Sequence, residues 1–79
     1  MEYIMAFGSA HRALKAEEAL KEAGAPFRLL PAPKALEPYC DLVISVSVVE
    51  FIRVAGILKD AGISPKSVYR KEGDEYVKV

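Results

Sequence analysis

Cys40 is the one side chain in this sequence that could act as a strong nucleophile. It is the only cysteine among the 79 residues, and it lies at the end of a loop rich in proline, Pro31–Asp41. A thiol attacks other groups as its thiolate, and a helix N-terminus or a nearby cation lowers the pKa of a cysteine below its usual value of about 8.5. If this chain performs covalent chemistry, we expect Cys40 to carry it.

Two further polar side chains could act on that thiol. Ser9 directly precedes a segment with helical periodicity, and His11 falls in its first turn. The free amides of a helix start, a hydroxyl and an imidazole can all stabilise a thiolate. Asp41 acts in the opposite direction, because a neighbouring carboxylate raises the pKa of a thiol. We therefore predict a site made of Cys40, Ser9 and His11, and the net effect on the thiol stays open.

Each of these residues also has a structural interpretation. A lone cysteine at the start of a strand is often a small buried hydrophobic residue. A serine such as Ser9 is typical of a helix N-cap, and a histidine such as His11 is typical of a solvated helix face. One cysteine and one histidine are too few ligands for a structural zinc site, so we predict no metal and no cofactor.

Composition narrows the class of protein. Eleven basic and eleven acidic side chains cancel, which argues against a nucleic-acid or anionic-membrane partner, because such partners need a basic patch. No apolar run approaches the ~18 residues that span a bilayer, and the short apolar start does not have the form of a signal peptide. We predict one domain over residues 1–79, located in the cytoplasm, where an unpaired thiol stays reduced.

The order of apolar runs and helical periodicity predicts the fold. The predicted strands are 3–7, 27–30, 42–46 and 68–71, with an extension at 76–79 reached through a hairpin turn at Glu72–Asp74. The predicted helices are 10–23 and 48–61, and Ser47 and Glu50 have the spacing of a capping box for the second. This order predicts an α+β fold of the ferredoxin-like βαββαβ type, a two-layer sandwich with an antiparallel sheet and both helices on one face.

An internal repeat supports this topology. Leu20–Gly24 and Leu58–Gly62 have nearly the same sequence, and each closes a predicted helix. In a βαββαβ sheet the first two strands run parallel, with the third antiparallel between them. We therefore expect the start of the first helix, the segment Pro38–Asp41 and the turn Gly62–Pro65 to share one edge of the sheet.

The second predicted helix is apolar around most of its circumference. It includes Val48, Val49, Phe51 and Ile52, and a helix of this kind is usually buried on more than one side. We predict a homodimer or a docking surface through helix 48–61. A few singly exposed aliphatic side chains would be an ordinary alternative.

The sequence also resembles a known family, the selenium/sulfur carrier-like small bacterial domains, over about residues 3–70. Members of that family have a Ser-x-His pair opening the first helix and a Cys-Gly pair after a proline-containing loop. Ser9, His11 and Cys40 match these positions, and Asp41 stands in place of the glycine. The segments that carry the resemblance are Phe7–Glu17, Leu20–Pro26, Arg28–Pro33 and Cys40.

The resemblance implies a function for the predicted site. Cys40 would carry sulfane sulfur or selenium as a persulfide or selenosulfide, and Ser9 and His11 would stabilise its thiolate. It implies a carrier or accessory protein rather than a stand-alone enzyme, with sulfur or selenium donor and acceptor proteins as partners. The alternative that the residues leave open is a non-catalytic module for protein interaction or small-ligand sensing.

Overall fold

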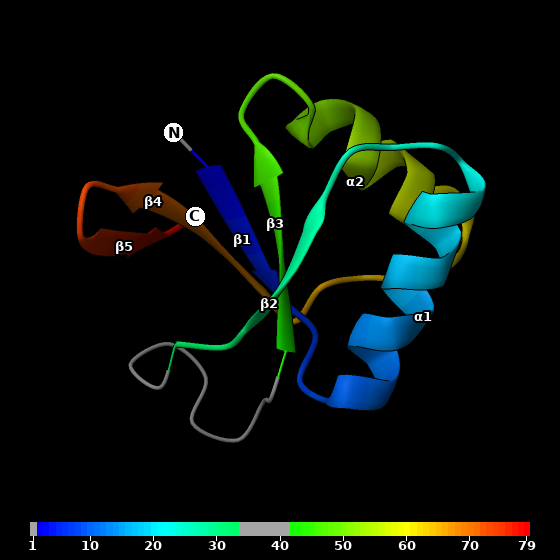
Figure 1. Ribbon diagram of the computed structural model, residues 1–79, viewed down its shortest axis with the longest axis horizontal. Coiled ribbons are helices and arrows are strands. Elements are labelled where there is room, and N and C mark those ends of the chain that lie inside the picture. Colours follow the sequence, from blue (N-terminus) through cyan, green and yellow to red (C-terminus); the bar gives the residue numbers. More distant parts are fainter. Residues whose placement is uncertain (1, 34–41) are drawn as a thin grey trace.

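The computed structural model describes residues 2–33 and 42–79. In these ranges a five-stranded antiparallel sheet has the strand order β2-β3-β1-β4-β5, and the two helices lie on one side of it (Figure 1). The elements in chain order are β1 (Glu2–Ala6), α1 (Ala10–Glu22), β2 (Arg28–Pro31), β3 (Leu42–Ser47), α2 (Phe51–Asp60), β4 (Ser67–Glu72) and β5 (Glu75–Lys78).

The predicted α+β fold with two helices and an antiparallel sheet is confirmed. The ferredoxin-like form is not confirmed in its predicted detail, because the sheet has five strands and β5 extends it beyond β4. The expected relation of the first three strands is present, since β3 pairs antiparallel with both β1 and β2. The single domain over residues 1–79 stays a prediction.

Both helices end in the same way, as the internal repeat predicted. The N–H of Ala25 donates to the carbonyl of Leu20 at 3.0 Å, and the N–H of Ile63 donates to the carbonyl of Leu58 at 2.8 Å. The glycine before each donor has a positive φ, 69° after α1 and 74° after α2. These are Schellman ends, in which a left-handed residue lets the chain fold back onto the last carbonyls.

The start of α2 differs from the prediction. Ser47 is the last residue of β3, and Glu50 occupies the N-cap without a side-chain cap hydrogen bond. The Glu50 N–H donates to the Ser47 carbonyl at 3.1 Å and closes a turn, while the Glu50 carboxylate lies 3.6 Å from Arg53. The capping-box prediction was therefore wrong, because pairing with Glu2 keeps Ser47 in the sheet.

The two faces of the sheet are buried differently. On one face the side chains of both helices pack onto β1 and β3. The helix and strand residues together form the larger part of the core. On the other face a smaller cluster forms without a helix, because successive strand residues point to opposite sides. The larger cluster contains Met5, Phe7, Ala13, Ala16, Leu20, Ala25, Ile44, Val46, Val54 and Leu58, and the smaller contains Ile4, Ala6 and Val43.

Candidate functional site

Ser9 caps the N-terminus of α1. Its backbone is extended and its Oγ accepts a hydrogen bond from the Arg12 N–H at 3.2 Å. Gly8 before it has a φ of 85°, and a Cβ at Gly8 would lie 3.3 Å from Cδ of Lys66. The predicted N-cap role of Ser9 is confirmed, and the chain between β1 and α1 has little room for a larger residue at Gly8.

The segment after α2 lies against this start of α1. The Lys66 N–H donates to the Ala6 carbonyl at 2.7 Å, and Arg12 Nη2 donates to the Ser64 carbonyl at 3.5 Å. These bonds join the end of β1, the first turn of α1 and the turn after α2, as the topology predicted. Lys66 itself was missed by the sequence reasoning, although it follows the predicted turn Gly62–Pro65 directly.

His11 lies exposed beside a cavity of about 290 Å³ at the ends of the two helices. Arg12 and Lys15 line this cavity with it, opposite residues 61–63 at the end of α2. The last carbonyls of a helix carry partial negative charge and favour nearby cations. Arg12 and Lys15 therefore place two cations near the C-terminus of α2.

The predicted nucleophile is outside the described residues. Cys40 and Asp41 both belong to residues 34–41, so nothing in the structure tests their predicted place beside α1. Of the predicted site, the structure shows Ser9 at the N-cap and His11 in the first turn of the same helix. The three-residue site therefore stays a prediction.

The described strands show where the chain enters and leaves residues 34–41. Pro31 at the end of β2 pairs with Leu42 at the start of β3, and Val43 pairs with Ala6 at the end of β1. The end of β1, the end of β2 and the start of β3 therefore lie at the same end of the sheet. From that end β1 continues through Gly8 into α1, so the helix start lies at the same end of the molecule as Leu42.

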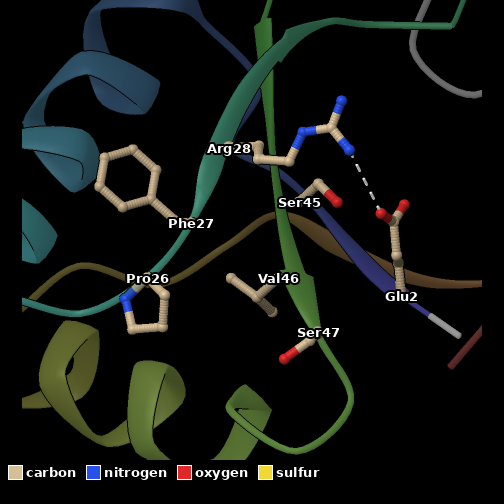
Figure 2. Close-up of a pocket in the computed structure, with 7 residues that line it drawn as sticks. All are labelled: Glu2, Pro26, Phe27, Arg28, Ser45, Val46 and Ser47. Atoms are coloured by element: carbon tan, nitrogen blue, oxygen red, sulfur yellow. Dashed lines mark ion pairs between the residues drawn. The ribbon is translucent and has the colours of Figure 1, made fainter.

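A second cavity, of about 230 Å³, lies at the opposite end of these strands (Figure 2). Its polar lining comes from Glu2, Arg28, Ser45 and Ser47. Arg28 Nη1 lies 3.6 Å from Glu2 Oε1. Sequence reasoning missed this group, because the alternation of strand residues assigns each to a face but only the register brings them together.

Two absences apply to the described part of the chain. Within residues 2–33 and 42–79, no three His, Cys, Asp or Glu side chains lie close enough together to hold a metal ion. In the same ranges, neither helix has the length and apolar character needed to cross a membrane.

Comparison with known proteins identifies the family of the chain. The searches of curated proteins and of solved structures found no match. A family model with the description "Putative Se/S carrier protein-like" matches residues 2–70, a range that contains Ser9, His11 and Cys40. This confirms the resemblance seen in the sequence. Because the match covers most of the chain, including both helices, the chain belongs to the Putative Se/S carrier protein-like family.

Proposed function

We propose that this protein carries sulfur or selenium on Cys40. The observation that supports the proposal is the family match over residues 2–70, since the description of that family names Se/S carriage. Cys40 is the only cysteine in the chain, so a cargo bound through a cysteine has one attachment point. The proposed compartment is the cytoplasm, which keeps unpaired thiols reduced.

The proposed reaction is a thiol exchange. The Cys40 thiolate attacks the outer sulfur of a persulfide on a donor protein, and a new S–S bond forms between Cys40 Sγ and the transferred atom. The S–S bond of the donor breaks, and its electron pair leaves with the donor thiolate. The transferred sulfur is already at the sulfane oxidation level, so no further oxidant is needed. An acceptor thiol removes the cargo by the same step, and selenium follows the same path as a selenosulfide.

In this proposal Ser9 and His11 stabilise the Cys40 thiolate. The Ser9 hydroxyl accepts from the Arg12 amide, and its own proton stays available for donation to an anion. His11 is exposed in the same helical turn. The pairing of Val43 with Ala6 supports this assignment, because it sets the start of β3 at the end of the sheet from which α1 begins.

The rate of alkylation tests the reactivity of Cys40. We expect iodoacetamide at pH 7 to modify the native protein faster than a free model thiol, because thiolate reacts and thiol does not. His11→Ala should slow the reaction severalfold. Arg53→Ala is the matched control, since it removes an exposed cation that lies about 10 Å along the helix from the end of α2. Modification of Cys40 only after denaturation would overturn the carrier proposal.

Intact mass spectrometry tests the cargo directly. After incubation with a low-molecular-weight persulfide, the native protein should gain the mass of one sulfur atom, and dithiothreitol should remove it. Cys40→Ser should gain nothing. An unmodified native protein, or an equal gain by Cys40→Ser, would contradict the proposed role of Cys40.

A second candidate function, a protein-interaction module, is favoured by the surface around the start of α2. Val49 and Ile52 there are 84% and 85% exposed, and Val48 is 42% exposed. We propose that this surface, within the predicted interface 48–61, forms a homodimer contact. Sedimentation should show a dimer that Val49→Asp weakens and that Lys59→Asp leaves intact. A monomeric wild-type protein at every concentration measured would exclude the homodimer.

We also infer that β1–β4 and the two helices follow the ferredoxin-like pattern, to which the β4–β5 hairpin adds a strand. The position of β1 between β3 and β4 supports this inference. An experimental structure with a different pairing of these strands would contradict it.

A further inference from the structure

The cavity at the far end of the sheet from Ser9 contains a buried hydroxyl. Ser45 in β3 is 2% exposed, and every other side chain buried to this extent in residues 2–33 and 42–79 is hydrophobic. No hydrogen bond joins its hydroxyl to any residue in these ranges. Figure 2 shows the hydroxyl directed toward the gap between Arg28 and Glu2. A buried hydroxyl without a partner is unfavourable, so a polar group that entered the cavity would gain a ready partner.

Two opposite charges lie beside this hydroxyl. Arg28 in β2 pairs directly with Ser45, and Glu2 in β1 pairs with Ser47 two positions further along β3. The guanidinium and the carboxylate meet at 3.6 Å, with side chains that are 68% and 32% exposed. An exposed ion pair of this length contributes little to stability, so a ligand could separate the two charges easily.

The cavity lies at the margin of the sheet and is also lined by Pro26, Phe27 and Val46. Figure 2 shows these three side chains on the helix side of β3, away from Arg28 and Glu2. β2 begins at Arg28, whereas β3 continues past Val46 to Ser47, so the end of β3 has no partner in β2. This difference in strand length opens the cavity of about 230 Å³ at the margin of the sheet.

We propose that this cavity binds a free α-amino acid with a small side chain, which it recognises by the charged head. The carboxylate of the ligand bonds to Arg28, its ammonium group bonds to Glu2, and the Ser45 hydroxyl bonds to the polar head between them. A ligand with a single charge fits less well, because a lone carboxylate approaches Glu2 and a lone amine approaches Arg28.

This site is independent of the proposed carrier function. It lies at the start of β1, whereas the end of β1 near Ser9 is about 13 Å away along the strand. None of its residues belongs to the predicted group of Cys40, Ser9 and His11. The two proposals can therefore fail separately.

An NMR titration with L-valine tests the amino-acid site. The amide signals of Arg28, Ser45 and Ser47 should shift saturably with L-valine. N-acetyl-L-valine lacks the ammonium group and L-valinamide lacks the carboxylate. Each should bind at least about tenfold more weakly, which is the effect of losing one charged hydrogen bond.

Three variants and a control complete the test. Glu2→Gln and Arg28→Gln should each weaken L-valine binding about tenfold or more, and Ser45→Ala severalfold. Glu50→Gln is the matched control, because Glu50 makes an ion pair of the same 3.6 Å length in α2. It should leave the affinity unchanged, and circular dichroism should show that every variant is folded.

Three results would overturn the proposal. They are the absence of a saturable shift at these amides, equal binding of N-acetyl-L-valine and L-valine, and an equal loss of affinity in Glu50→Gln. Equal binding of the acetylated compound would identify a simple anion contact at Arg28. Cys40→Ser should bind L-valine normally, so this experiment stays valid if the carrier proposal fails.

Discussion

Ser9 and Ser45 have the same side chain but differ in burial and in hydrogen bonding. Ser9 is half-buried at the start of α1, where its Oγ accepts a hydrogen bond from the Arg12 amide. Ser45 is buried in the central part of β3, and no residue in the described ranges bonds to its hydroxyl. One hydroxyl satisfies the backbone of a helix, whereas the other is left for a group that comes from outside.

The difference shows that neighbouring residues in the sequence can identify a serine that caps a helix. They cannot identify a serine whose hydroxyl is available to a ligand. A cap satisfies an amide two or three residues away, so its partner is near in sequence. A binding hydroxyl is recognised by the lack of a partner, which depends on everything that packs around it. The following predictions test this contrast, beginning with the largest expected effect on the free energy of unfolding.

Gly8→Ala should destabilise the end of the molecule that contains Ser9. The φ of 85° at Gly8 is unfavourable for alanine, and the new Cβ would lie 3.3 Å from Lys66, so we expect a loss of roughly 1–3 kcal/mol. Gly56→Ala is the control in α2, where a Cβ meets nothing within 4 Å. It should gain about 0.5–1 kcal/mol, because alanine favours a helix interior. Urea unfolding measures both changes, and an equal effect of the two would contradict the backbone argument.

Ser9→Ala should cost about 1 kcal/mol, because the Arg12 amide loses its acceptor at the helix start. Urea unfolding followed by circular dichroism measures the loss. Ser9→Asp restores an acceptor at the N-cap and should recover most of the stability. Full stability of Ser9→Ala would show that the cap bond at 3.2 Å contributes nothing.

Ser45→Ala should not lower the free energy of unfolding, in contrast to Ser9→Ala. Removing a buried hydroxyl that has no partner among the described residues removes its desolvation cost, so the free energy of unfolding should stay the same or rise by up to about 1 kcal/mol. The same urea experiment compares it with Ser9→Ala. A loss as large as that of Ser9→Ala would mean that the Ser45 hydroxyl makes a stabilising bond, and it would remove the contrast between the two serines.

Arg28→Gln should have the smallest effect on stability, below about 0.5 kcal/mol, because the pair with Glu2 is exposed. Glu50→Gln should change stability by a similar amount, since its ion pair has the same 3.6 Å length. Only the first should alter the binding of L-valine. A large stability loss in Arg28→Gln alone would make Arg28 a structural residue rather than a binding one.

Local features of the fold could be predicted well from the sequence. Ser9 before a periodic segment predicted the start of α1, and Gly24 and Gly62 predicted the two helix ends. The prediction failed at Ser47, where a capping-box spacing competed with pairing to Glu2 and the strand pairing prevailed. Backbone bonds of a central strand outweigh the preference of one side chain for a cap.

The candidate sites were less predictable, because each depends on contacts between distant segments. The turn after α2 was expected beside α1, but the hydrogen bond from the Lys66 N–H to the Ala6 carbonyl required the three-dimensional arrangement. Glu2, Arg28 and Ser45 lie on three different strands. A shift of one residue in register would send any of them to the other face of the sheet.

By itself, the sequence determined the features whose cause lies within a few residues. These are the single thiol at Cys40, the cap at Ser9 and the paired helix ends. Only the tertiary structure decided which strand is longer than its neighbour and which charges meet. It also decided that the buried Ser45 hydroxyl has no hydrogen-bond partner among residues 2–33 and 42–79. The physical reason is that capping and helix termination use short-range hydrogen bonds, whereas register and burial are set by the packing of the whole sheet.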